Sequence, residues 1–149
     1  MGIYIFGGLK NNNIATNELF FFRAHPKTYA DHCIFDINCL EAIKPKICGK
    51  APIPRFGHYT GFIQNKYLII YGGYNCSLFK LTGSKIVNDV VLLNLQIFQW
   101  EFLACHGDIP DGRWNCSGFI NGNKIIILVG KTEANTSDNS IYKLDFDFQ

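Results

Sequence analysis

Two stretches of sequence, PIPRFGH at residues 52–58 and PDGRWNC at residues 110–116, decide how this chain is organised. They lie 58 residues apart, and each has a proline followed three residues later by an arginine. Gly49 and Gly107 precede them at the same spacing. Several landmarks that keep one spacing predict an internal repeat, which settles the fold when it is present.

Apolar runs that end in glycine accompany the two stretches. Residues 3–8 read IYIFGG, residues 67–73 read YLIIYGG and residues 124–130 read KIIILVG. Residues that are apolar at consecutive positions must be covered on both faces, which is typical of strands in stacked sheets. The terminal glycines mark places where φ becomes positive or two backbones approach closely. We therefore expect one such strand in each copy of the repeat.

The composition supports a single folded, β-rich region. The chain has 149 residues, of which 48% are hydrophobic, 17% charged and 15% aromatic. Such a chain can bury a sizeable core, and its many aromatic residues favour strands. The net charge of +2 is too small to indicate nucleic-acid binding. No apolar run is long enough for a membrane helix, and the first residues do not form a signal peptide. We expect a cytoplasmic or nuclear protein whose six cysteines are reduced.

One complete copy of the repeat spans residues 49–105. Its four strands, called a to d, are expected at residues 58–63, 67–71, 89–95 and 99–103. Short connections between a and b and between c and d predict hairpins, and the connection from b to c is long. Trp100 on strand d is expected to fill the space between neighbouring copies.

The same spacing divides the rest of the chain. Residues 1–48 should hold strands b to d of an earlier copy, and residues 106–149 should hold strands a to c of a later one. In the earlier copy, residues 31–37 align with 89–95 and are preferred as strand c. The alternative is that residues 17–22 form strand c and residues 23–30 are an insertion. Ala42 takes the place of Trp100 in this copy.

Together these landmarks resemble the Kelch repeat of host cell factor, galactose oxidase and related β-propellers. The resemblance implies an all-β fold of four-stranded antiparallel meanders, with about 2.5 blades of an incomplete propeller. Repetition in every blade indicates a structural role for the motif residues. Arg55 and Arg113 should tie their loops to carbonyls or an acid, and His58 should be a hydrogen-bonded structural histidine. The structural residues are Gly7, Gly8, Gly49, Pro52, Arg55, His58, Gly72, Gly73, Asp89, Trp100, Gly107, Pro110, Arg113 and Gly130.

The resemblance also implies a non-enzymatic scaffold for protein–protein interaction. The long loops, residues 9–30, 74–88 and 131–138, should share one face with the d-to-a connections, and loops on a rigid scaffold commonly carry binding sites. This face is rich in basic residues, so the predicted partner is an acidic protein or peptide. The lysines predicted to contact it are Lys44, Lys46, Lys50, Lys80 and Lys85. The alternative reading of these lysines is a solvated basic rim.

Two other functions and three forms of assembly stay open. Galactose oxidase uses a similar propeller with a metal, but Cys105, His106 and Cys116 show no clear ligand spacing, so we expect no metal, cofactor or catalytic residue. The chain could also be the regulatory Kelch arm of a larger signalling protein. An incomplete propeller exposes strand edges and blade faces, so remaining blades of a longer chain, self-association or a partner would cover them. No membrane contact is expected.

Overall fold

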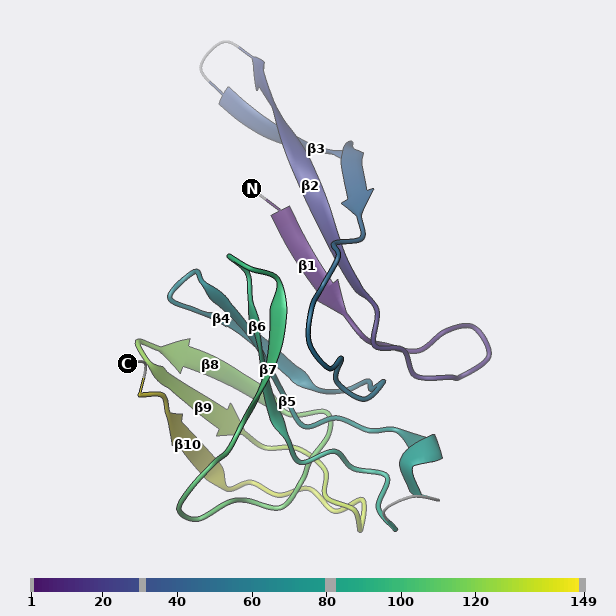
Figure 1. The fold of residues 1–149 in the computed structure, drawn as a ribbon, viewed down its shortest axis with the longest axis vertical. Helices are drawn as coiled ribbons and strands as arrows, with labels where there is room; N and C mark the ends of the chain where they lie inside the picture. Colours follow the sequence, from purple (N-terminus) through teal and green to yellow (C-terminus); the bar gives the residue numbers. More distant parts are fainter. Residues whose placement is uncertain (1, 30–31, 80–82, 148–149) are drawn as a thin grey trace.

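The fold is an arc of three antiparallel β-sheets. A computed structural model describes residues 2–29, 32–79 and 83–147, and these residues form strands and one short 3-10 helix (Figure 1). This confirms the predicted all-β class. The strands are β1 (Gly2–Phe6), β2 (Leu19–Tyr29), β3 (His32–Ile43), β4 (Tyr59–Ile63), β5 (Tyr67–Tyr71), β6 (Val90–Asn94), β7 (Gln99–Leu103), β8 (Ser117–Asn121), β9 (Lys124–Leu128) and β10 (Ile141–Asp145), and the 3-10 helix is η1 (Cys76–Leu78).

The second sheet shows the complete blade. Its strand order is β4-β5-β6-β7, and every neighbouring pair is antiparallel. Its strands begin and end within one residue of the positions that the sequence predicts. The other two sheets are three-stranded in the described part of the chain, in the orders β1-β2-β3 and β10-β9-β8.

The core lies in the two junctions between sheets. The first junction places Phe6 and Leu19 of the first sheet against the face of the second sheet that carries Leu68, Ile70 and Trp100. The second junction packs the opposite face of the second sheet against β9. Side chains on both faces of β5 and β6 are therefore buried, which explains why these strands are apolar at consecutive positions.

The preferred assignment of strand c in the first blade is wrong. The strand that pairs with β1 is β2, and it begins at Leu19, so the alternative at residues 17–22 locates its start. Residues 23–29 are not an insertion, because they continue β2 as part of a long hairpin with β3. Residues 32–37 of the segment that was preferred as strand c lie in β3.

Loop lengths explain this error. The last residue of strand b pairs with the first residue of strand c in all three blades, as Phe6 with Leu19, Tyr71 with Val90 and Leu128 with Ile141. The first blade thus has a short b-to-c loop and a long c-to-d hairpin, and the second blade has the reverse. The extra residues lie beyond the far end of the sheet (Figure 1).

Among the described residues, no helix is long and apolar enough to cross a membrane.

Candidate functional site

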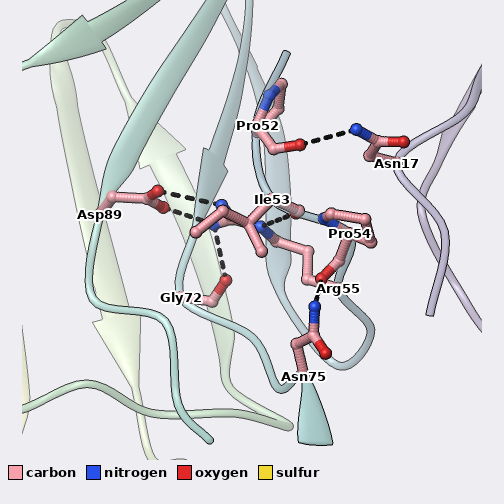
Figure 2. A network of polar contacts seen from close by, with 8 residues as sticks. All are labelled: Asn17, Pro52, Ile53, Pro54, Arg55, Gly72, Asn75 and Asp89. Atoms are coloured by element: carbon pink, nitrogen blue, oxygen red, sulfur yellow. Dashed lines mark hydrogen bonds and ion pairs between the residues drawn. The ribbon is translucent and has the colours of Figure 1, made fainter. Parts of the chain in front are cut away.

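Arg55 anchors the segment that enters the second blade. Its side chain is fully buried and forms a two-pronged ion pair with Asp89, with Nη2 at 2.9 Å from Oδ2 and Nη1 bonded to Oδ1 (Figure 2). The guanidinium also donates to the carbonyls of Gly72 and Ile53, both at 3.0 Å. One side chain therefore joins strands a, b and c at the end of the sheet where the long loops begin.

Arg113 occupies the same position in the third blade but has a different partner. It is also fully buried, and its Nη2 lies 3.1 Å from Oδ2 of Asp138. Its Cζ lies 4.3 Å from the centre of the Tyr142 ring. The residue that corresponds to Asp89 by strand pairing is Ser140, because each directly precedes strand c. The acid therefore reaches Arg113 from two residues earlier in the loop.

Two asparagines, Asn17 and Asn88, connect neighbouring blades. Asn17 Nδ2 donates to the carbonyl of Pro52 at 2.9 Å, and Asn88 Nδ2 donates to the carbonyl of Pro110 at 3.0 Å. Both asparagines directly precede the acidic residue before strand c. The signal was present in the sequence, since Asn17-Glu-Leu19 repeats the pattern of Asn88-Asp-Val90.

The glycine pairs donate backbone hydrogen bonds to the arginine carbonyls of the next blade. Gly8 N donates to Arg55 O at 2.9 Å, and Gly73 N donates to Arg113 O at 2.9 Å. A Cβ on Gly72, which has a φ of +68°, would lie 2.4 Å from that second carbonyl. Only glycine avoids this clash, so the pair is needed where another blade docks. Gly7 stands in the same relation to Arg55.

The remaining repeat residues lie along the connections between blades. Gly49 (φ +82°) has no room for a side chain, because a Cβ would lie 2.8 Å from Trp100 O. Pro52 is buried and Pro110 half-buried, whereas Gly107 is open to solvent. Gly130 packs closely against Arg113 and Cys116. Gly49, Pro52 and Gly130 therefore have structural roles in the packing of the blades.

His58 is a half-buried packing residue. Its ring packs edge-on against Phe6, with 5.3 Å between ring centres. Among the described residues, Nδ1 of His58 has no hydrogen-bond partner, and a hydrogen bond of this histidine stays a prediction. Burial, followed by the charge of Arg55, lowers the pKa of His58 from 6.5 to about 4, so the ring is neutral near pH 7.

The predicted partner-binding lysines do not occupy equivalent positions. Lys44 Nζ lies 2.7 Å from Glu18, which Lys10 also approaches at 3.1 Å, and these two lysines lower the pKa of Glu18 to about 2. Lys46 is exposed, and Lys80 lies outside the described residues. Lys50 lies beside β7, with Nζ 5.9 Å from the Phe102 ring.

The connection that carries Lys44, Lys46 and Lys50 follows the outer edge of the second sheet. Cys48 forms a parallel bridge with Gln99, the first residue of β7. Lys85 lies instead in the loop between β5 and β6, where its Nζ is 5.5 Å from the Phe79 ring. The basic residues Arg23, His25 and Lys27, which were expected in a loop, belong to β2.

The loop-rich face, formed by residues 7–18, 72–79, 83–89 and 129–140, carries an aromatic cluster. Phe56, Tyr74 and Trp114 pack with ring centres 5.1–6.1 Å apart, and all three are half-buried. Lys131 Nζ lies 5.5 Å from the Trp114 ring. Glu133 accepts a hydrogen bond from Ser84 Oγ at 2.6 Å, so the second and third loops contact each other. Rings and lysines are thus held by adjacent blades on one face.

The cysteines and acids that the structure describes form no cluster of metal ligands. In the part of the chain that the structure describes, no three His, Cys, Asp or Glu side chains lie close enough to hold a metal ion. Cys48, Cys76, Cys105 and Cys116 are free thiols. Burial raises the pKa of the Cys105 and Cys116 thiols, so neither is an activated thiolate.

Comparisons with known proteins agree with this geometry. The family model "KLHDC2/KLHL20/DRC7 Kelch-repeats domain" matches residues 1–149. Kelch repeat-containing protein 2 of Saccharomyces cerevisiae is 26% identical over 95% of this chain and 15% of its own length. Kelch domain-containing protein 2 of Bos taurus is 28% identical over 76% of this chain and 26% of its own length. The solved structure of YjhT matches 97% of this chain and 46% of that chain, with a TM-score of 0.68 and 16% identity.

The fold and the repeat define the class as a Kelch-type β-propeller region. The family match covers the whole chain, and the chain belongs to the Kelch-repeat family. It spans about a quarter or less of the two curated relatives' length and about half of the YjhT chain. The blades therefore correspond to part of a propeller as those proteins have it.

Proposed function

We propose that this Kelch region is a non-enzymatic interaction scaffold that binds an acidic protein segment on its loop-rich face. The observation that supports it is the half-buried cluster of Phe56, Tyr74 and Trp114 with Lys131 above it. Aromatic rings on rigid elements give contact area at low entropic cost, and lysines at the rim attract acids. Arg55 and Arg113 hold the segments that carry two of these rings.

Charge and shape define the partner. Lys10, Lys85 and Lys131 belong to three different loops of this face. An extended segment that places an apolar side chain on the aromatic cluster can direct carboxylates to these lysines.

Peptide selection tests this proposal. A random peptide library displayed on phage is selected on the immobilised full chain, on the double variant Lys85→Glu/Lys131→Glu and on the control Lys66→Glu. Lys66 lies in the turn between β4 and β5, at the opposite end of the sheet. We expect peptides that combine Asp or Glu with an apolar residue from the wild type and the control, and their loss with the double variant. Selection of the same peptides by all three proteins would refute the acidic-partner proposal.

A further inference from the structure

The repeated arginine of the third blade has donors that its surroundings do not use. Arg113 is fully buried, and its Nε donates to the carbonyl of Asp111 at 3.4 Å. Nη2 forms an ion pair with Asp138 at 3.1 Å, but neither Nη1 nor Nη2 has a hydrogen-bond partner among the described residues. Buried donors without acceptors cost free energy. The guanidinium of Arg113 can therefore bind further acceptor oxygens.

Arg55, the equivalent arginine of the second blade, shows where such oxygens belong. Its Nη1 and Nη2 donate to the two carboxylate oxygens of Asp89, which directly precedes strand c. In the third blade the residue that directly precedes strand c is Ser140. A neutral hydroxyl thus occupies the position from which an acid reaches both prongs of the guanidinium.

Ser140 and Arg113 lie on either side of one carboxylate. Ser140 N donates to Oδ1 of Asp138 at 2.8 Å, and Oδ2 of the same group lies 3.1 Å from Nη2 of Arg113. Hydrogen bonds from the backbone and hydroxyl of Ser140, followed by the charge of Arg113, lower the pKa of Asp138 to about 2. A group attached to the Ser140 hydroxyl would therefore meet Arg113 once Asp138 moves aside.

Both changes are open to solvent. Ser140 is exposed, as are the loop residues 133–137, and the side chain of Asp138 is 25% exposed, so it can turn outward. A phosphoserine carries a charge of about −1.5 to −2 near pH 7 and three acceptor oxygens. Arginine binds phosphate through two parallel N–H bonds, as it binds carboxylate. A phosphate on Ser140 would supply the contact that Asp89 makes in the second blade.

Neighbouring hydroxyls on this face have less suitable surroundings. Ser84 Oγ donates to Glu133 at 2.6 Å, so a phosphate there would meet a carboxylate. The hydroxyls of Thr132 and Thr136 lie 2.9 Å apart and bind each other. Among these hydroxyls the contacts favour Ser140 as the one that gains a partner when it becomes charged.

We propose that Ser140 is a phosphorylation site whose phosphate binds Arg113 and ties the start of strand a to the start of strand c in the third blade. A protein kinase transfers the terminal phosphoryl group of ATP to Oγ of Ser140. The Oγ–P bond forms, the bond from that phosphorus to the oxygen of the departing ADP breaks, and the hydroxyl proton is released. The phosphate replaces the carboxylate of Asp138 at the guanidinium. This site does not depend on the acidic partner of the loop-rich face.

Moving the acid tests the geometry. Asp138→Asn removes the present partner of Arg113, and Asp138→Asn/Ser140→Asp places a carboxylate at the position equivalent to Asp89. The control Asp138→Asn/Ser137→Asp adds the same charge on the other side of residue 138. In urea unfolding, we expect the single variant and the control to have lower midpoints than the wild type. The variant with Asp at residue 140 should equal or exceed the wild type. Equal midpoints of the two double variants would overturn the proposal.

The modified side chain is tested directly. Phosphoserine is incorporated by amber suppression at residue 140 of the full chain, and in a control at the exposed residue Ser137. Each phosphate is titrated by phosphorus NMR, and its ordinary second pKa is about 6. We expect the pKa at residue 140 to lie about one unit below that at residue 137, because Arg113 stabilises the doubly charged form. The same pKa at both residues would mean that the phosphate does not reach Arg113.

Occurrence of the modification needs its own measurement. The full chain and the variant Ser140→Ala are expressed in eukaryotic cells treated with a phosphatase inhibitor, and their peptides are analysed by mass spectrometry. We expect phosphate on Ser140 of the wild type and none on the corresponding peptide of the variant. Phosphate on other residues alone, or on no residue, would refute phosphorylation of Ser140.

Discussion

The two junctions between blades have the same walls but different contents. In the first, Trp100 fills the space between Phe6 and the apolar face of β5 and β6. In the second, the equivalent walls surround a cavity of about 240 Å³. The repeat therefore specifies the lining of each junction, whereas the ring that fills it comes from a fourth strand. The stability of the two junctions should differ accordingly.

Removing the ring from the first junction should have the largest effect. Trp100→Ala should lower the free energy of unfolding by about 3–5 kcal/mol, because it leaves a cavity at a site that is almost fully buried. Urea unfolding followed by circular dichroism measures this loss. The control Trp114→Ala removes a half-buried ring from the loop-rich face and should cost about 1 kcal/mol. Similar losses in the two variants would contradict the role of Trp100 in the junction.

His58 should make the first junction sensitive to acid. Its pKa is about 4 in the folded chain against an ordinary 6.5, so the unfolded chain binds the proton more readily between these values. Stability is therefore complete above pH 6.5 and falls as the pH decreases towards 4, with a loss of about 2 kcal/mol at pH 5.

Comparison of His58→Phe with the wild type isolates this contribution. Urea midpoints measured from pH 7.5 to 4.5 should fall less steeply in the variant. The reason is that phenylalanine at position 58 carries no group that titrates in this range. Parallel slopes in the two proteins would show that His58 is not buried in its neutral form.

Filling the cavity in the second junction should change the free energy of unfolding least, and it should raise this free energy rather than lower it. Leu144→Phe adds apolar volume at the cavity and should raise the free energy of unfolding by about 0.5–1 kcal/mol. Ile141→Phe, on the exposed face of the same strand, should change it by less than about 0.5 kcal/mol. A loss of stability in Leu144→Phe alone would mean that this space is already filled in solution.

Landmarks that repeat in the sequence located most of the second blade. Its strands, the burial of Trp100 and the equivalence of Ala42 in the first blade to Trp100 follow from the spacing of 58 residues. Features that depend on loop length could not be predicted from this spacing. The spacing put the extra residues of the first blade in its b-to-c loop, whereas pairing puts them in the hairpin of β2 and β3.

Partners of the repeated arginines were only partly predictable. The sequence indicates that Arg113 needs an acid or carbonyls, but Asp138 lies at a different loop position from Asp89. Only the folded loop brings it near. The aromatic cluster was missed because Phe56 and Trp114 look like ordinary residues that follow the arginine, and Tyr74 like one that follows the glycine pair.

The long hairpin of β2 and β3 changes the outline of the molecule. β2 has 11 residues where β6 has 5, and at about 3.3 Å per residue the difference is a ribbon of roughly 20 Å. A two-stranded ribbon gains little stability of its own, so the backbone pairing of residues 26–29 with 32–35 should open and reclose while the sheets stay closed. The hairpin of β2 and β3 extends from the end of the sheet opposite the loop-rich face (Figure 1). We therefore expect limited proteolysis to cut the chain first in this hairpin.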